Sequence, residues 1–344
     1  MRIFFLALLC CAQISSAGEA WAARRPAGAA AAQKSASVKA SSSVKNKAAS
    51  FTRAQRPSSG SGNTAGAAKG KAVSGKKKGA APVSRAETVR AYITMNLTGK
   101  KIVNSKNADQ AIAPASLTKV LTMFVILDQV KSRKVSLDDK VVVSGKASGT
   151  GGSSLDLRAG QTVLLRDLLK GMAVVSGNDA AVAAAQHVAG TEAAFVRMMN
   201  KKARSLGMKR SIFKNVHGLP AKGQQSTARD MLALSRAYLA AHPQAITLFH
   251  SQPYMDFYTW HQNTNPLLGT LEGVDGLKTG FVASSGYNLI TTARCGGERL
   301  VSVVLGAPNK EVRLREARRL LLEAYAKVHA DNAGKKTKPS AKRS

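Results

Sequence analysis

The sequence predicts an α+β fold in which an antiparallel sheet flanked by helices is joined to a mostly helical lobe. Three observations support this prediction. Alternating, β-rich segments indicate a hairpin at residues 89–104, helical signals dominate residues 114–241, and strand patterns return at residues 277–305. A last helical pattern covers residues 311–328. Because no internal repeat of about 20 to 50 residues is visible, solenoids and propellers are excluded.

Residues 1–22 have the pattern of a secretory signal peptide. Arg2 precedes an apolar run from Ile3 to Cys11, and small residues surround Trp21 before Ala23. The run is about half as long as the roughly 20 residues needed to cross a bilayer, so a cleaved signal is favoured over a membrane anchor. We therefore expect an exported, periplasmic or cell-envelope protein without a transmembrane helix after cleavage.

Two of the three cysteines lie in this predicted signal, which leaves Cys295 alone in the mature chain. A single cysteine cannot form an intramolecular disulfide. It falls in an apparent turn at residues 294–297, without metal-ligand spacing around it. We interpret Cys295 as a residue without a chemical role.

Residues 23–85 are expected to be a disordered basic linker rich in Ala, Lys and Ser. Between Arg24 and Arg85 there are fourteen basic residues and no acidic one, and Phe51 is the only aromatic residue. Such a segment has too little apolar side chain to offset the entropy of ordering. Residues 331–344 are expected to be a smaller disordered basic tail. These two segments supply much of the formal net charge of +33.

The basic charge raises the question of a nucleic-acid partner. No aromatic residues alternate with the lysines to stack on bases, and an exported protein rarely meets nucleic acid, so we expect none. An anionic envelope polymer or a membrane surface is the favoured partner of the linker. A linker that serves only for solubility remains an alternative.

Residues 86–330 are expected to form the catalytic domain. It begins with the hairpin, whose strands lie near residues 89–97 and 101–104. Pro114 then opens a helix that is apolar at nearly every angle, and such a helix is buried. The remaining expected elements are helices at residues 164–175, 179–188, 191–207 and 226–241, strands at 277–279, 287–293 and 300–305, and a closing helix at 311–328.

Metal and phosphate chemistry find no support in the sequence. None of the six histidines is spaced as a ligand pair, and no glycine-rich loop ends in Lys-Ser or Lys-Thr after a strand. We expect neither a metal nor a cofactor. His217 is interpreted as a residue that orders its loop rather than as a base.

The informative motif is Ser116-Leu117-Thr118-Lys119, at the start of the apolar helix. Residues three apart on a helix share a face, so the lysine amine can reach the serine oxygen. A serine needs a neighbouring base to become a nucleophile, and a lysine is a base only when burial keeps it neutral. Placing Ser116 in the first turn would also offer the positive end of the helix dipole to an oxyanion.

Ser-x-x-Lys alone is weak evidence, because it also occurs at Ser42, Ser74 and Ser211. Ser176-Gly177-Asn178, between two predicted helices, is equally weak alone. Together with Lys278-Thr279-Gly280 on a predicted strand, however, the motifs follow in the order found in β-lactamases and penicillin-binding proteins. Three motifs in this order, each in the right element, are a strong signal for a serine acyl-enzyme.

Over about residues 88–328 the chain resembles the low-molecular-mass penicillin-binding proteins of peptidase family S11, the D-alanyl-D-alanine carboxypeptidases. The resemblance implies a β-lactamase/transpeptidase-like fold, a peptidoglycan stem peptide as substrate, and β-lactam antibiotics as covalent inhibitors. Beyond the three motifs, it is carried by residues 114–115, 179–180, 215–220, 226–230, 263–268 and 274–277.

The resemblance also implies a role for each site residue. Ser116 would attack the carbonyl of the penultimate D-Ala, and Lys119 would take its proton. Ser176 would relay a proton to the leaving amine while Asn178 holds the substrate amide. Lys278 and Thr279 would meet the terminal carboxylate beside Gly280, and the backbone N–H groups of Ser116 and Phe281 would form the oxyanion hole.

Two features depart from the family pattern. Val282 stands where family members commonly carry Thr, which puts a substrate contact or a hydrogen bond at the strand edge in doubt. The usual C-terminal β-domain and its amphipathic anchor are not recognised after Val328, so attachment to the membrane by that route is not expected.

There are three alternatives to a carboxypeptidase. A class A β-lactamase would need a Glu-x-x-Leu-Asn segment, which the sequence lacks, so rapid penicillin hydrolysis is not expected. A D,D-endopeptidase would cut peptidoglycan cross-links with the same site. A non-catalytic basic cell-wall-binding protein is disfavoured because Ser116, Lys119 and Lys278 are all intact.

Overall fold

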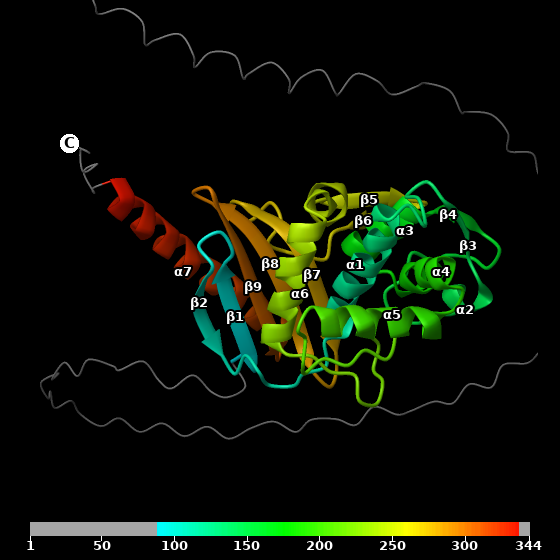
Figure 1. Cartoon of the computed structure of the whole chain (residues 1–344), viewed down its shortest axis with the longest axis horizontal. Coiled ribbons are helices and arrows are strands. Elements are labelled where there is room, and N and C mark those ends of the chain that lie inside the picture. The colour runs from blue at the N-terminus through cyan, green and yellow to red at the C-terminus, as the bar shows by residue number, and fades with distance from the viewer. Residues whose placement is uncertain (1–87, 337–344) are drawn as a thin grey trace, which may run out of the picture. The chain divides into compact units, whose positions relative to one another are not determined.

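The computed structural model describes residues 88–336, with side chains to residue 334. The predicted signal peptide, the whole of the predicted linker and residues 337–344 of the predicted tail therefore lie outside the described residues. The described part shows the predicted α+β architecture, with a sheet, helices on its faces and a helical lobe beside it (Figure 1).

A five-stranded antiparallel sheet forms one half of the fold. Its strand order is β2-β1-β9-β8-β7, so the N-terminal hairpin pairs with the last strand of the chain. The bounds are β1 Ala91–Asn96, β2 Lys101–Lys106, β7 Val274–Val282, β8 Gly286–Cys295 and β9 Glu298–Ala307. The strand β7, one edge of this sheet, carries the predicted Lys-Thr-Gly motif.

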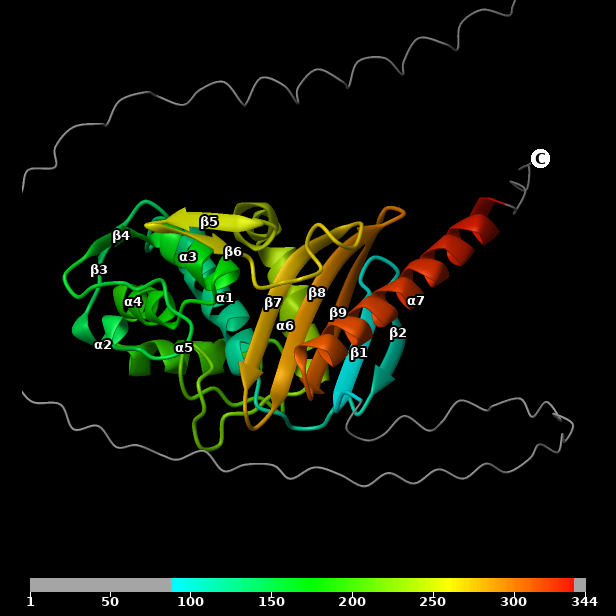
Figure 2. The same ribbon diagram turned by 180° about the vertical axis from the view of Figure 1, so that it is seen from behind.

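Helices cover both faces of the sheet, as the alternation of side chains along β9 requires. Leu300 and Val304 point into a core shared with α7 (Lys310–Lys336), whereas Val301 and Val303 belong to the core on the opposite face. Figure 2 shows α7 lying across the sheet, and α6 (Ala228–Ala241) lies against the other face.

The helical lobe is built around α1 (Thr118–Lys131), in which every residue from 118 to 127 is buried. This confirms the prediction that a helix apolar at nearly every angle is enclosed. Around it stand α3 (Leu165–Val174), α4 (Asn178–Ala189), α5 (Glu192–Ser205), the short α2 (Gly145–Ser148), and the hairpins β3 (Lys140–Val142) with β4 (Thr162–Leu164) and β5 (Tyr254–Phe257) with β6 (Thr259–Gln262).

The structure corrects the predicted elements at two points. Ser116 does not lie in the α-helix but in a 3₁₀ turn, Ala115–Leu117, which leads directly into α1. The closing helix continues to Lys336, so residues 331–336, expected to belong to a tail, are helical. No proline interrupts it there, and Asn332 donates a hydrogen bond to the carbonyl of Gly296, which fastens this end to the β8–β9 turn.

Two hairpins and a π-helical turn, Ile246–His250, were not predicted, because their segments are short and carry no clear period. Between residues 88 and 336, none of the helices combines the length and apolar character needed to cross a membrane.

Candidate active site

The site forms where the start of α1, the start of α4 and the edge strand β7 meet. Ser116 projects from the 3₁₀ turn, and Lys119 lies one turn later, in the first turn of α1. The Lys119 Nζ is 3.2 Å from the Ser116 Oγ. The predicted contact between amine and hydroxyl is therefore present, although a 3₁₀ turn and an α-helix share it.

The Lys119 amine is completely enclosed and has two further partners. Its Nζ lies 2.6 Å from Asn178 Oδ1 and 2.8 Å from the carbonyl oxygen of His217, both of which accept hydrogen bonds. A neutral amine has two N–H groups and one lone pair. The two oxygens match the two N–H groups, and the lone pair is left for the Ser116 hydroxyl.

The charge balance also favours the neutral amine. Burial lowers the pKa of Lys119 well below its ordinary value, and the nearby positive charge of Lys278 lowers it further. The carboxylate of Asp179 acts in the opposite direction but is the smaller influence. A lysine in this setting can take a proton at neutral pH.

Ser176 and Asn178 lie at the junction of α3 and α4. Ser176 is buried and has a φ of 69°, a conformation that is uncommon outside glycine and redirects the chain between the two helices. The Asn178 side chain is held at both ends, because its Nδ2 donates to the Gly151 carbonyl at 2.7 Å while its Oδ1 faces Lys119. Asn178 therefore orients the lysine in addition to facing the site.

Asp179 was given no role of its own in the sequence analysis, yet its buried carboxylate organises the wall of the site. It accepts hydrogen bonds from the backbone N–H groups of Leu155 and Leu157 and from the Ser154 hydroxyl, which lies 2.6 Å away. These bonds fix the loop before β4 against the start of α4. An Asp directly after Ser-Gly-Asn, at a helix N-terminus, was the available signal.

Lys278 lies on β7 with only 1% of its surface exposed. Within the described residues, its hydrogen bond is to the carbonyl of its neighbour Thr279, at 3.1 Å. Burial, together with the positive charge of Arg313, lowers the pKa of Lys278 to about 7. An enclosed cation without a carboxylate partner is suited to receive the anionic end of a ligand.

The rest of the β7 motif frames the serine. The Thr279 hydroxyl donates to the Thr264 hydroxyl at 2.8 Å. Gly280 passes so close to the serine that a β-carbon there would stand 3.1 Å from the Ser116 backbone nitrogen. Phe281 has 52% of its surface exposed and lies against Tyr287, with ring centroids 4.4 Å apart. The strand thus brings its backbone, and not a side chain, to the serine.

The loop that contains His217 and Gly218 completes the site. The His217 Nδ1 accepts a hydrogen bond from the Leu219 backbone, and burial lowers the pKa of His217 to about 4, so the ring is neutral. This agrees with the prediction that His217 orders its loop. The sequence did not reveal that its carbonyl would bind Lys119, since a backbone atom leaves no mark in a motif.

Gly218 is required by close contact. It has a φ of 93°, and a β-carbon there would lie 1.9 Å from the carbonyl oxygen of Ala115, the residue before Ser116. Only glycine fits both conditions without a shift of the backbone. This glycine therefore sets how closely the loop approaches Ser116.

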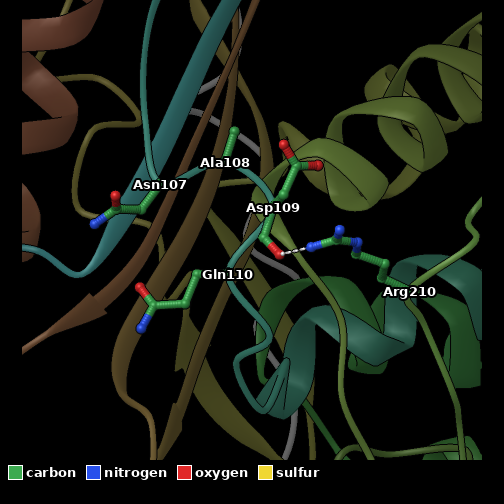
Figure 3. A pocket seen from close by; sticks show the side chains of 5 residues that line it. All are labelled: Asn107, Ala108, Asp109, Gln110 and Arg210. Carbon is green, nitrogen blue, oxygen red and sulfur yellow. Dashed lines mark hydrogen bonds between the residues drawn. The ribbon is translucent and has the colours of Figure 1, made fainter.

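A hollow of about 620 Å³ is lined by a different set of residues (Figure 3). It is lined by the connection between β2 and the serine, residues 107–110, and by Arg210, whose guanidinium donates to the Asp109 carbonyl at 2.9 Å. The Asp109 carboxylate pairs with Arg229. These contacts hold the connection in place, and none of the predicted site residues lines this hollow.

The chain is similar in sequence to proteins of one known family. The model of the peptidase S11 family, described as D-alanyl-D-alanine carboxypeptidase, matches residues 76–309. D-alanyl-D-alanine carboxypeptidase DacC of Escherichia coli is 41% identical over 240 residues, which is 67% of this chain and 60% of the relative. DacF of Bacillus subtilis is 37% identical over 71% of this chain and 64% of its own length. The chain thus spans less than two thirds of these relatives.

Other similar proteins extend the comparison. A D-alanyl-D-alanine endopeptidase of Pseudomonas aeruginosa is 32% identical and matches 67% of this chain and 74% of its own length. The crystal structure of penicillin-binding protein 6B of Escherichia coli is 38% identical, with a TM-score of 0.66 over 70% of this chain and 78% of that one. Penicillin-binding protein D2 of Listeria monocytogenes, solved in an ampicillin-bound form, is 31% identical with a TM-score of 0.61, over 70% of this chain and 99% of that one.

Proposed function

The chain belongs to the peptidase S11 family of D-alanyl-D-alanine carboxypeptidases, and we propose from this premise that it removes the terminal D-Ala from peptidoglycan stem pentapeptides through an acyl-enzyme on Ser116. The observation that supports the proposal most is the enclosed Lys119 amine, 3.2 Å from the Ser116 Oγ and with its N–H groups facing two other oxygens. Residues 86–330 would be the catalytic domain.

In the proposed mechanism, Ser116 Oγ attacks the carbonyl carbon of the penultimate D-Ala while Lys119 accepts the hydroxyl proton. The negative oxygen of the intermediate would be held by the backbone N–H groups of Ser116 and Phe281. Ser176 would pass a proton to the leaving amine, and free D-Ala departs. Water then hydrolyses the ester and regenerates the serine hydroxyl.

Substrate recognition would rest on β7 and α4. Lys278 and Thr279 would hold the terminal carboxylate, because Lys278 is an enclosed cation whose Nζ has no carboxylate partner among the described residues. Gly280 would let the substrate backbone approach the strand closely. Asn178 would contribute to holding the substrate amide through its Nδ2 group.

The first test is covalent labelling by penicillin. The β-lactam carbonyl should acylate Ser116, so intact-mass spectrometry should show one adduct on the wild-type protein and none on Ser116→Ala. Thr150→Ala, a change at a hydroxyl outside the site, serves as the control and should still be labelled. An adduct that persists in folded Ser116→Ala would exclude this mechanism.

A D,D-endopeptidase that cleaves cross-links is the second candidate, because the Pseudomonas aeruginosa relative bears that name and matches at 32% identity. Assays on a stem pentapeptide and on a purified cross-linked dimer distinguish the two activities. We expect free D-Ala from the pentapeptide. Cleavage of the dimer without any release of D-Ala from the pentapeptide would favour the endopeptidase.

We also propose an exported, periplasmic or cell-envelope location, supported by the signal pattern at residues 1–22. The basic segment at residues 23–85 would then contact an anionic envelope polymer or a membrane surface through its lysines and arginines. Its fourteen basic residues without a single acidic one between Arg24 and Arg85 support this contact.

A further inference from the structure

A cavity of about 310 Å³ is lined in part by Gly218, whose backbone lies against Ala115, the residue before Ser116. One wall comes from the end of β7 and the turn after it, with Val282 and Ser284, and the other comes from the loop that begins at Gly218 and includes Ala221 and Lys222. None of the mechanistic roles above uses this cavity.

Strand geometry fixes the position of the cavity relative to the reaction. Along β7, Lys278 comes two residues before Gly280 and Val282 two residues after it, and each pair of residues spans about 6 to 7 Å. Gly280 is the point at which the strand passes the Ser116 backbone. The cavity therefore begins two residues along β7 beyond the point that passes the serine. It lies on the side opposite the site proposed for the terminal carboxylate.

This position corresponds to a particular part of the substrate, if the function proposed above is correct. A peptide with its carboxylate at Lys278 and its scissile carbonyl at Ser116 must continue along β7 past Gly280. The acyl half of the substrate then runs toward Val282 and Ser284. The side chain of the residue that precedes D-Ala-D-Ala is the group that reaches this cavity.

The walls are suited to the aliphatic part of a side chain. Pro220, Ala221 and Val282 supply apolar surface, and Val282 does so at the position where a hydroxyl-bearing Thr is common in the family. Gln224 also lines the cavity, but its amide is engaged elsewhere. Its Oε1 accepts from the Lys214 backbone at 3.0 Å, and its Nε2 donates to the Leu219 carbonyl at 2.9 Å.

The charge at the rim is positive. Lys222 is exposed, and none of the carboxylates within the described residues forms an ion pair with it. Arg90 adds a second cation nearby, because its guanidinium donates to the Ser284 carbonyl at 3.4 Å. The described lining contains no acidic residue. A carboxylate is therefore attracted to this rim, and an ammonium group is repelled.

We propose that this cavity is a subsite for the side chain of the residue that precedes D-Ala-D-Ala, and that Lys222 selects an aliphatic side chain ending in a carboxylate over one ending in an ammonium. Lys222 would act on substrate choice and not on the chemical step, because it lies on the acyl side and outside the group of residues around Ser116.

Three synthetic peptides test this proposal: Nα-acetyl-lysyl-D-Ala-D-Ala with its ε-amine free, acetylated or succinylated. The aliphatic part of the lysyl side chain is the same in all three peptides, and its terminal group is positive, neutral or negative. For the wild type we expect kcat/KM for D-Ala release to be highest for the succinylated peptide, by about two- to five-fold over the acetylated one, and lowest for the free amine.

Lys222→Glu should invert the preference between the succinylated and the free-amine peptides, and Lys222→Arg should keep the wild-type order. Lys134→Glu makes the same change of charge at an exposed position that does not line the cavity, and it should also keep the order. If Lys222→Glu ranks the three peptides as Lys134→Glu does, the subsite is refuted while D-Ala release still supports the proposed function. If none of the peptides releases D-Ala from the wild type, both proposals fail.

A cavity-filling variant tests the position independently of charge. Ala221→Trp places a large side chain in the cavity from an exposed residue of the loop. We expect kcat/KM to fall for the succinylated lysyl peptide but not for Nα-acetyl-alanyl-D-Ala-D-Ala, whose side chain is too short to enter. An equal fall for both peptides would show that the loop acts on Ser116 and that the cavity is not a subsite.

Discussion

At the scale of single residues, two enclosed lysines with different surroundings would carry the proposed chemistry. Lys119 has three oxygen neighbours, Ser116 Oγ, Asn178 Oδ1 and the His217 carbonyl, and Lys278 has only the carbonyl of Thr279 within hydrogen-bond distance among the described residues. Both have a lowered pKa because burial disfavours the charged form. In the proposed mechanism, Lys119 must be neutral to accept a proton, and Lys278 must be charged to hold a carboxylate.

These opposite requirements predict a dependence of kcat/KM on pH. Burial lowers the pKa of Lys278 to about 7, so the cation predominates at lower pH, is half lost near pH 7 and is lost further as the pH rises. For a peptide with a free C-terminal carboxylate, we expect kcat/KM to fall above pH 7, by up to about tenfold for each pH unit. The lowered pKa of Lys119 acts on the acidic side, where protonation removes the base.

Lys278→Arg provides the comparison, because a guanidinium keeps its charge throughout this range. Its kcat/KM should be lower at pH 6, since the geometry changes, but should no longer fall between pH 7 and pH 9. The measurement is D-Ala release from a pentapeptide across pH 5 to 9. Parallel alkaline limbs in the wild type and the variant would contradict the assignment to Lys278.

At the scale of elements, the site depends on three segments that meet without side chains between them. The 3₁₀ turn with Ser116 lies between the edge strand β7, which approaches through Gly280, and the 217–219 loop, which approaches through Gly218. Close approach of backbones is what allows a turn, a strand and a loop to share one small volume. A side chain at either glycine would separate them.

Gly218→Ala should therefore reduce both stability and reactivity. The new β-carbon would lie 1.9 Å from the Ala115 carbonyl, and a φ of 93° is unfavourable for any residue with a side chain. We expect a loss of about 1–3 kcal/mol in the free energy of unfolding, together with at least about a tenfold slower acylation by penicillin.

Gly223→Ala is the matched control in the same loop. Gly223 has a φ of 79°, but a β-carbon added there would have Lys214 Cε as its nearest neighbour, 3.7 Å away. This variant should have the conformational cost of a side chain at positive φ but no steric clash with the Ser116 turn. Its acylation rate should therefore stay close to that of the wild type. Stability is measured by urea unfolding and acylation by stopped-flow with a chromogenic penicillin. Equal acylation rates for the two variants would refute the role given to Gly218.

A buried histidine, His250, also fixes the position of the strand that carries Lys278. The His250 Nδ1 donates to the Leu277 carbonyl, one residue before Lys278, and its Nε2 accepts from the Tyr238 hydroxyl of α6 at 2.9 Å. Burial lowers the pKa of His250 to about 3, so the ring is neutral at neutral pH. The strand that carries Lys278 is thereby fixed to α6 and to the π-helical turn.

At the scale of the whole molecule, the dominant property is the formal net charge of +33. Such a charge attracts anionic surfaces over a distance set by the ionic strength. We expect the 344-residue chain to sediment with vesicles that contain anionic lipid, or with purified anionic wall polymer, at about 50 mM salt, and to be mostly released at about 500 mM salt. Ser116→Ala should behave in the same way, because its charge is unchanged. Binding that is independent of salt would contradict an electrostatic contact.

Much of the fold could be predicted from the sequence because its elements have clear periods. The hairpin, the buried helix, the strands β7 to β9 and most helix bounds agree with the expectations, since alternation and amphipathic spacing are local properties. The hairpins β3–β4 and β5–β6 could not be predicted, because strands of three or four residues are too short for a period. The 3₁₀ turn at Ser116 was also hidden, since Ala, Ser and Leu suit either kind of helix.

The sequence by itself determined which residues are candidates for the proposed chemistry: the serine proposed as the nucleophile, the lysine one turn away, and the strand motif proposed to receive an anion. Such information is carried by side-chain type and local spacing, both of which are written in the chain. Only the tertiary structure decided the electrostatics and the space around these groups. The lowered pKa values of Lys119 and Lys278 depend on tertiary contacts, as do the hydrogen bond from Lys119 to the His217 carbonyl and the close approach at Gly218. The segments that make these contacts lie up to about 160 residues apart, and no local pattern encodes their meeting.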